Sequence, residues 1–219
     1  MTLADPAGQP LLHTRSYEVR AYKESEGRLR IRGKVHDTKP AGLYFAQDDE
    51  PLSIHEMVLD IVVHFPSLEI IDAALVMETH PHTECVRIVD HYRELIGLSI
   101  ARGFTHKVRE LFGGPRGCTH TTALLQAMAP VAIQSMWSMR EPAERETPVV
   151  IGTRPTPAEM RERVSFNLNT CHVWAEDGPM FTALDSDKDI PLPIWAVARL
   201  DKLGLDHDAW YARHGAPGE

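Results

Sequence analysis

The sequence predicts an α+β protein, with an antiparallel sheet built from hairpins and helices packed on one face of it. Two stretches of alternating apolar residues, 17–35 and 55–77, predict the hairpins, and apolar residues at helical spacing after them predict the helices. The 219 residues show no break between similar halves. We therefore expect a flexible N-terminus over residues 1–12, a single α+β domain over residues 13–185 and a helical tail over residues 186–219.

The first hairpin is predicted from an alternating run on each side of a turn at residues 24–27. The residues that share its inward face are Tyr17, Val19 and Ala21 before the turn and Leu29, Ile31 and Val35 after it. The outward face carries four basic residues beside Glu18, namely Arg20, Arg30, Arg32 and Lys34. Such a charged row is typical of a solvated sheet face, although an anion site stays open.

The second hairpin has one apolar row on each strand. These rows are His55, Met57, Leu59, Ile61, Val63 and Phe65 on the first strand and Ile71, Ala73, Leu75 and Met77 on the second. A three-residue loop at Pro66-Ser67-Leu68, with Phe65 opposite Glu69, brings both rows to one face. That register sets Glu56 across from Glu78, with His80 just beyond. Opposed carboxylates must splay into water, share a proton or hold a cation, and all three outcomes stay open.

Helical periodicity follows the second hairpin. Thr83 suits the N-cap of a helix whose apolar stripe includes Cys85, which points inward either as a core residue or as a reactive or metal-binding thiol. A short helix over Phe104–Phe112 ends at two glycines. The glycine-rich turn that leads from there to Cys118 is in principle an anion or oxyanion site, and the next helix is expected to kink at Pro130.

The C-terminal part is expected to complete the sheet. Residues 140–157 lack an apolar period and predict an exposed connection or a mobile lid. A short helix over Pro157–Arg163 is followed by two alternating segments, Phe166–Trp174 and Met180–Leu184, which we expect as strands. The tail predicts an amphipathic helix over Ile194–Tyr211, packed on the body or on a second subunit, with an apolar side made of Trp195, Leu200, Leu203 and Trp210.

Composition restricts the partners. Lys and Arg number 23 against 31 Asp and Glu, and the net charge of -8 argues against nucleic-acid binding. No apolar run is long enough for a membrane span and no signal peptide is visible, so we expect no membrane partner and a cytoplasmic location. There, Cys85, Cys118 and Cys171 would stay thiols, and the 12 histidines raise the expectation of a metal or proton-transfer site. A homo-oligomer stays open.

Several motifs carry a resemblance to a known family. They are Tyr22, Asp37-Thr38-Lys39-Pro40, Ile54-His55-Glu56-Met57, the run from Tyr92 to Gly97 and, most specifically, the run from Val108 to His120 with its Gly-Gly-x-x-Gly-Cys-Thr-His string. On these residues the chain resembles the bacterial family of unknown function numbered 2889, from about residue 15 to about residue 180. The order of strands, helices and cysteines is also similar to iron–sulfur scaffold proteins of the IscU and SufE kind. Those proteins carry more thiols near the cluster than Cys85 and Cys118 supply.

The family resemblance implies a lyase of aromatic catabolism, because members occur in bacteria that degrade lignin-derived aromatics. Such pathways include an enzyme that opens a phenylcoumaran ring and releases its hydroxymethyl group as formaldehyde. That reaction needs acid/base chemistry and no cofactor, in agreement with a sequence that carries no nucleotide-binding fingerprint. Its aromatic substrate would be the small-molecule partner.

The resemblance and the residue types together suggest the site. The catalytic candidates are Glu56, Glu78, His55 and His80 at the hairpin end and Asp37, Lys39 and Tyr44 after the first hairpin. A Glu or His of the hairpin would act as the base and Lys39 or Tyr44 as the acid. The substrate-binding candidates are Phe45, Arg116, His120, His172 and Trp174. We expect the hairpin end, the Lys39 loop and the glycine turn to meet at one cavity, although each residue also has a structural alternative, such as an Asp37–Lys39 ion pair.

Two other classes of function stay open. One is a zinc or iron protein with Cys85, Cys118 and His120 as ligands, joined by a histidine of the second hairpin. The other is a non-catalytic scaffold or accessory protein.

Overall fold

The computed structural model describes residues 3–101, 103–139, 154–208 and 210. The chain forms two compact units, one over residues 1–143 and one over residues 144–219. This division comes earlier in the chain than the boundary at residue 185 that the sequence suggested. No helix of the described part is long and apolar enough to cross a membrane.

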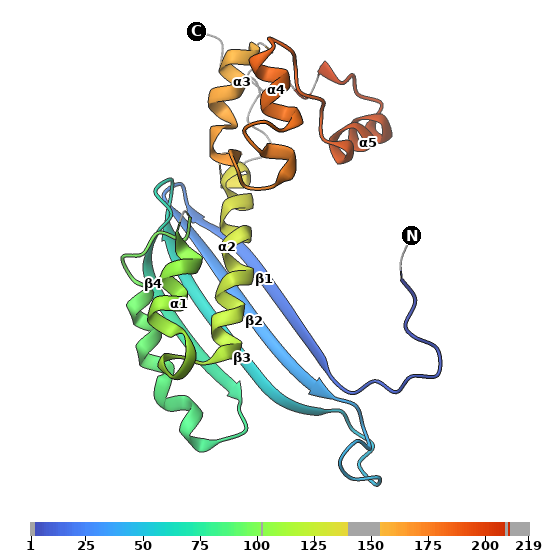
Figure 1. Ribbon diagram of the computed structural model, residues 1–219, viewed down its shortest axis with the longest axis vertical. Helices are drawn as coiled ribbons and strands as arrows, with labels where there is room; N and C mark the ends of the chain where they lie inside the picture. The colour runs from blue at the N-terminus through green and yellow to red at the C-terminus, as the bar shows by residue number, and fades with distance from the viewer. Residues whose placement is uncertain (1–2, 102, 140–153, 209, 211–219) are drawn as a thin grey trace. The chain divides into compact units, whose positions relative to one another are not determined.

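The first unit is built on a four-stranded antiparallel sheet whose strands follow chain order (Figure 1). The strands are β1 Thr14–Ser25, β2 Arg28–Lys39, β3 Leu52–His64 and β4 Glu69–Thr79. Alternate residues of β2, Leu29, Ile31 and Val35, are buried in the core on the face that the helices cover. The α+β fold class and both predicted hairpins are confirmed, because period-two alternation selects strands that bury one face.

The outer face of the sheet carries a row of ion pairs. Arg30 and Arg32 donate to the two carboxylate oxygens of Asp60, at 2.5 and 2.6 Å. Lys34 Nζ donates to Glu56 Oε1 at 2.5 Å, and Arg20 pairs with Glu18. Opposite charges alternate across the strands and are partly hydrated, so the basic residues are neutralised within the sheet. The prediction of a charged, solvated sheet face is confirmed.

The register of the second hairpin is as predicted in its centre and differs at its ends. Met57 pairs with Met77, but the connection is a four-residue turn over residues 65–68, and the register shifts between Val62 and Val63. The extra residue on β4 turns Ile70 into the core and leaves Ile71 on the outside. The prediction that Ile71 lies on the core face is therefore wrong, because a bulge inserts one residue into the alternation.

A second register shift removes the predicted carboxylate pair. Glu56 lies across from Thr79, because the extra residue on β4 at this end is Glu78. Glu78 is exposed, whereas Glu56 is partly buried and bonded to Lys34. Glu56 and Glu78 therefore do not face each other, and the predicted carboxylate pair at this hairpin end is wrong.

The helices of the first unit follow the sheet in the chain. They are the 3-10 helix η1 Thr83–Leu95, α1 Phe104–Phe112, the short 3-10 helix η2 Gly114–Arg116 and α2 Thr119–Met139. The bounds of α1 are those predicted. At η1 the capping position is His82 rather than Thr83, and no side chain caps it. Tyr92 and Leu95 are the buried residues of η1, and Cys85 packs against the core in a partly buried position.

One glycine of β2 determines how closely α2 packs on the sheet. A Cβ atom at Gly33 would lie 2.6 Å from Met128 Sδ and 3.0 Å from Leu124 Cδ1. Four residues along β2 from Gly33 lead to Asp37, about 13 Å away, and eight residues back along α2 from Met128 lead to His120, about 12 Å away. The close approach at Gly33 therefore brings the N-terminal end of α2 level with Asp37.

All regular elements among the described residues of the second unit are helices. Its elements are α3 Pro157–Arg163, the 3-10 helices η3 Ser165–Asn167 and η4 His172–Trp174, α4 Pro179–Asp185 and α5 Ile194–Leu203. The helix predicted at α3 is confirmed, and Thr156 and Glu159 cap it reciprocally. The two predicted strands are wrong. The alternation in them is too short to separate the two periods, and a small core of Val164, Phe181 and Leu184 is buried by helical turns instead.

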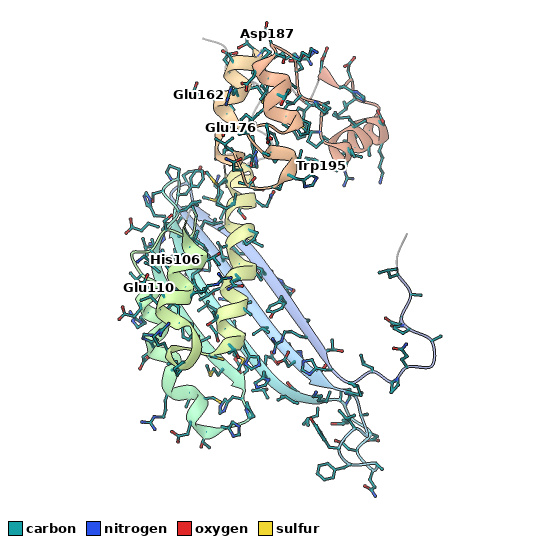
Figure 2. All side chains as sticks on the ribbon, in the orientation of Figure 1. His106, Glu110, Glu162, Glu176, Asp187 and Trp195 are labelled. Carbon is teal, nitrogen blue, oxygen red and sulfur yellow. The ribbon has the colours of Figure 1, made fainter. Side chains whose placement is uncertain are left out.

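The predicted tail helix is shorter than expected. It ends at Leu203, where Gly204 takes a left-handed conformation. Ala196 and Leu200 form its buried side, whereas Trp195 is 65 % exposed and stacks edge-on against Trp210. Figure 2 labels Trp195 on this helix. The connection predicted over residues 140–157 lies outside the described residues up to 153.

Candidate functional site

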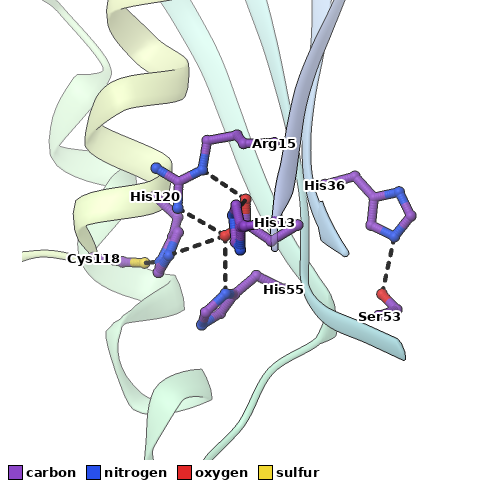
Figure 3. Close-up of polar contacts among 8 residues, drawn as sticks. His13, Arg15, His36, Ser53, His55, Cys118 and His120 are labelled. Atoms are coloured by element: carbon purple, nitrogen blue, oxygen red, sulfur yellow. Dashed lines mark hydrogen bonds and ion pairs between the residues drawn. The ribbon is translucent and has the colours of Figure 1, made fainter. Parts of the chain in front are cut away.

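A buried carboxylate marks the candidate site. Asp37 lies at the end of β2 on the core face, and its side chain is only 1 % exposed. A carboxylate in such a place must be compensated by hydrogen bonds or an opposite charge. Arg15, its cross-strand partner on β1, donates from Nε to Oδ1 at 2.6 Å and from Nη2 to Oδ2 at 2.7 Å (Figure 3). The two side chains form a bidentate, charge-assisted pair.

This pair keeps Asp37 ionised. The two hydrogen bonds from Arg15 lower the pKa of the Asp37 carboxyl far below its ordinary value, and they outweigh the burial that would raise it. The same bonds raise the pKa of the Arg15 guanidinium. The end of β2 therefore holds a fixed negative charge, with a fixed positive charge beside it.

Three histidines surround the same carboxylate. His55 Nδ1 lies 3.0 Å from Asp37 Oδ2, His120 Nε2 lies 3.4 Å from the same oxygen, and His13 Nε2 lies 3.3 Å from Oδ1. His55 is the register partner of Asp37 on β3, and His120 comes from the first turn of α2. The rings of His55 and His120 stack with centroids 3.8 Å apart. The side chains of His55 and His120 are partly exposed, whereas Asp37 is closed off from solvent.

His120 is held in its neutral form. Its partial burial lowers the pKa of the imidazole below the ordinary value, and the nearby His55 and Arg15 add to the effect. Asp37 opposes this shift without reversing it. A neutral imidazole carries one donor and one acceptor nitrogen, so His120 can accept a proton at neutral pH.

A cysteine completes the cluster. Cys118 Sγ lies 3.6 Å from His120 Nδ1 (Figure 3). The buried Tyr92 holds its backbone, since the Cys118 N–H donates to Tyr92 Oη at 2.9 Å and the Tyr92 hydroxyl donates to the Cys118 carbonyl at 3.2 Å. Burial raises the pKa of the Tyr92 hydroxyl, which keeps it protonated. The thiol is thereby placed at the start of α2 by a side chain of η1.

Of the catalytic and substrate-binding residues predicted, the structure brings three together, namely Asp37, His55 and His120. Cys118, predicted as a metal ligand, lies beside His120. Arg15 and His13 were missed. The sequence predicted a first hairpin that begins at Tyr17. In the structure the pairing continues to Arg15, which lies across from Asp37. The Asp37–Lys39 ion pair is wrong, because Asp37 pairs with Arg15.

The remaining predicted residues lie elsewhere. Glu56 is on the opposite sheet face from its neighbour His55, as are His36 and Ser53, so the predicted meeting of Glu56 with His120 is wrong. His80 bonds to the His82 carbonyl at 2.9 Å in an exposed turn. Tyr44 and Phe45 are exposed on the loop between β2 and β3, which begins just after Lys39.

Three further predicted residues, Arg116, His172 and Trp174, belong to other elements than those that carry the Asp37 cluster. Arg116 donates to the carbonyls of Arg109 and Glu110 at the end of α1, a capping role. Two residues of the same helix that were not predicted for the site, His106 and Glu110, lie on its exposed side (Figure 2). His172 and Trp174 belong to the second unit, where Trp174 packs edge-on against Phe181.

The metal set predicted from Cys85, Cys118 and His120 is not assembled. Among the described residues, Asp37, His55 and His120 are the one group of three with candidate ligand atoms all within 4.8 Å. Both oxygens of that carboxylate already accept hydrogen bonds from Arg15, and a cation placed between them would face the guanidinium charge. The arrangement fits an ion pair with attached imidazoles better than a cation site.

The fold and the site define an α+β protein with a carboxylate–imidazole centre at one end of an antiparallel sheet. Residues 13–134, more than half of the chain, match the family described as protein of unknown function DUF2889, and the chain belongs to this family. Every residue of the centre lies within the matched range. No curated protein and no solved structure matches the chain.

Proposed function

We propose that this protein is a cofactor-independent lyase with His55 as its catalytic base. The observation that carries the proposal is the contact between His55 Nδ1 and the ionised Asp37 at 3.0 Å. A carboxylate at that nitrogen selects the tautomer with hydrogen on Nδ1, which leaves the lone pair of Nε2 free. An imidazole oriented in this way is a general base for a hydroxyl group of a substrate.

The reaction proposed is the opening of a phenylcoumaran ring with loss of formaldehyde. His55 Nε2 takes the proton of the hydroxymethyl group, and the carbon–carbon bond to that group breaks as formaldehyde leaves. The electron pair forms a carbon–carbon double bond while the neighbouring carbon–oxygen bond to the aryl oxygen breaks. The aryl oxide then takes the proton from the imidazolium of His55. Proton and electrons balance without an oxidant or a reductant.

The substrate class rests on the family resemblance of the motifs around Asp37, His55 and Cys118. The loop of residues 40–51 adds a structural argument, because it joins the two strands that carry Asp37 and His55. Its Tyr44 and Phe45 side chains are exposed, and aromatic side chains stack readily on an aromatic ligand. We propose that this loop contacts the aromatic ring of the substrate.

The test is formaldehyde release from a phenylcoumaran alcohol by the purified full-length chain. His55→Gln should lower the rate by about 100-fold or more, the usual contribution of a positioned general base. His64→Gln is the matched control, because His64 lies exposed at the other end of β3, bonded to Ser67, and should keep the wild-type rate. Absence of turnover by folded wild-type protein, or full activity of His55→Gln, would contradict the proposal.

Metal analysis separates this proposal from a zinc or iron protein. The acid/base lyase should work with less than about a tenth of an equivalent of either metal after mild purification, whereas a structural thiolate or imidazole site retains its metal. Formaldehyde release that disappears on chelation and returns with zinc or iron would contradict the proposal and show a metal-dependent enzyme instead.

A further inference from the structure

The Asp37 carboxylate orients a second imidazole that the proposed base does not use. His120 lies with Nε2 3.4 Å from Asp37 Oδ2 and with Nδ1 3.6 Å from Cys118 Sγ. Thiol, imidazole and carboxylate are thus joined in a row through the two nitrogens of one ring. This is the arrangement in which a base activates a nucleophile and is itself oriented by a third group.

Cys118 stands at the start of α2, next to the imidazole of His120. The Cys118 carbonyl accepts the first hydrogen bond of α2, from the Thr122 N–H at 2.9 Å, so the residue stands at the N-terminal end of a helix of 21 residues. A helix N-terminus carries a partial positive charge. Tyr92 holds the backbone on both sides of the thiol, which keeps Sγ directed at His120.

The other two cysteines provide an internal comparison. Cys171 is exposed in the second unit, and Cys85 is partly buried against the core of the first. Within the described residues, neither has a hydrogen bond to an imidazole, whereas Cys118 does. Cys118 is therefore set apart by its neighbours and not by its exposure.

We propose that Cys118 is a nucleophilic residue of this site that adds reversibly to the carbonyl carbon of a small aldehyde. The aldehyde class rests on the proposed function, because formaldehyde is the product released beside His55. In the addition step the thiol proton passes to His120 Nδ1, the sulfur–carbon bond forms and the carbon–oxygen π bond breaks. The carbonyl oxygen then takes the proton from His120, and the product is a hemithioacetal. No electron is gained or lost, and reversal releases the aldehyde.

The test compares the three cysteines within one full-length chain. Iodoacetamide labelling at pH 7, followed by peptide mass spectrometry, should modify Cys118 at least about 10-fold faster than the more exposed Cys171, as an activated thiol requires. His120→Gln should lower the Cys118 rate by about 10-fold or more. The rates of Cys85 and Cys171 should stay unchanged, and the unchanged Cys85 rate shows that the core is intact.

Formaldehyde itself is the second probe. It should slow the labelling of Cys118 more than that of Cys171, and dilution should restore the rate. The proposal is overturned by Cys118 labelling no faster than Cys171, by a rate that His120→Gln leaves unchanged, or by equal protection of both thiols. These measurements need no turnover. If the protein releases no formaldehyde but Cys118 is labelled fast and protected by formaldehyde, the proposed lyase is refuted and the nucleophilic cysteine stands. If the protein releases formaldehyde but Cys118 is neither fast nor protected, only the nucleophilic cysteine is refuted.

Discussion

The substitution Asp37→Asn tests the central electrostatic feature of this protein. It keeps the size of the side chain and removes a negative charge that is only 1 % exposed. Arg15 then loses its opposite charge and both carboxylate acceptors, which lie at 2.6 and 2.7 Å. The asparagine carbonyl can replace one acceptor, but its NH₂ group points a donor at donors.

The expected loss of stability follows from the burial of the two partners. Removal of one member of a buried ion pair costs about 3–5 kcal/mol. The Arg15 side chain is 34 % exposed, so water recovers part of the interaction, and we reduce the figure to about 2–3 kcal/mol. Far-UV circular dichroism during urea unfolding at pH 7 measures the difference.

Asp60→Asn is the matched control for this measurement. Asp60 also accepts from two arginines, Arg30 and Arg32, but on the hydrated outer face of the sheet. Its replacement should cost less than about 1 kcal/mol. A loss below about 0.5 kcal/mol for Asp37→Asn, or equal losses for both variants, would refute the claim that burial increases the contribution of the Arg15–Asp37 pair to stability.

The pH dependence of the same difference has a definite sign. The folded pKa of Asp37 lies below its unfolded value of about 3.9. The stabilisation by the charged form is therefore complete above about pH 4 and is lost as the pH falls through the folded pKa. The gap between wild type and Asp37→Asn should decrease below pH 4.

Three further predictions concern the surroundings of the centre. Tyr92→Phe removes both hydrogen bonds to the Cys118 backbone and should cost about 1–3 kcal/mol in urea unfolding, with slower alkylation of Cys118. An unchanged unfolding free energy and alkylation rate would contradict the role of Tyr92 in holding Cys118. Gly33→Val should cost about 1–3 kcal/mol and lower activity, because its branched side chain meets Met128, and a neutral result in thermal unfolding would contradict the close packing. The lowered pKa of His120 predicts that its NMR titration midpoint lies below about 6.5, and a midpoint above that value would refute the neutral imidazole.

Features that depend on neighbouring residues in the chain were predictable. The alternation over residues 17–35 and 55–77 specifies two hairpins with one buried face, and the central Met57–Met77 pairing follows from it. The helix over Phe104–Phe112 ends at two glycines, and α3 begins at a capping Thr156. Each of these signals acts within one or two turns of backbone, where local propensity and capping decide the structure.

The candidate site was only partly predictable. Asp37, His55 and His120 were chosen for their chemical types, but the predicted set also contained residues such as Glu56, which lies on the other face of the sheet. One register shift on β4 decides whether Glu78 meets Glu56, and a second decides which side of the sheet Ile71 occupies. A bulge of this kind adds a residue without changing the hydrophobic composition of the strand. Side-chain type alone does not say which face of the sheet a residue occupies once the alternation is interrupted.

The amino-acid sequence by itself determined the fold class, the hairpins, α1 and α3, and the family to which residues 13–134 belong. The tertiary structure alone decided that Arg15 neutralises Asp37, that three imidazoles gather around that carboxylate and that a thiol lies beside one of them, His120. The physical reason is distance along the chain. These contacts join β1, β2, β3 and α2, and they depend on sheet register and on the close packing of α2 at Gly33, neither of which any short window of sequence contains.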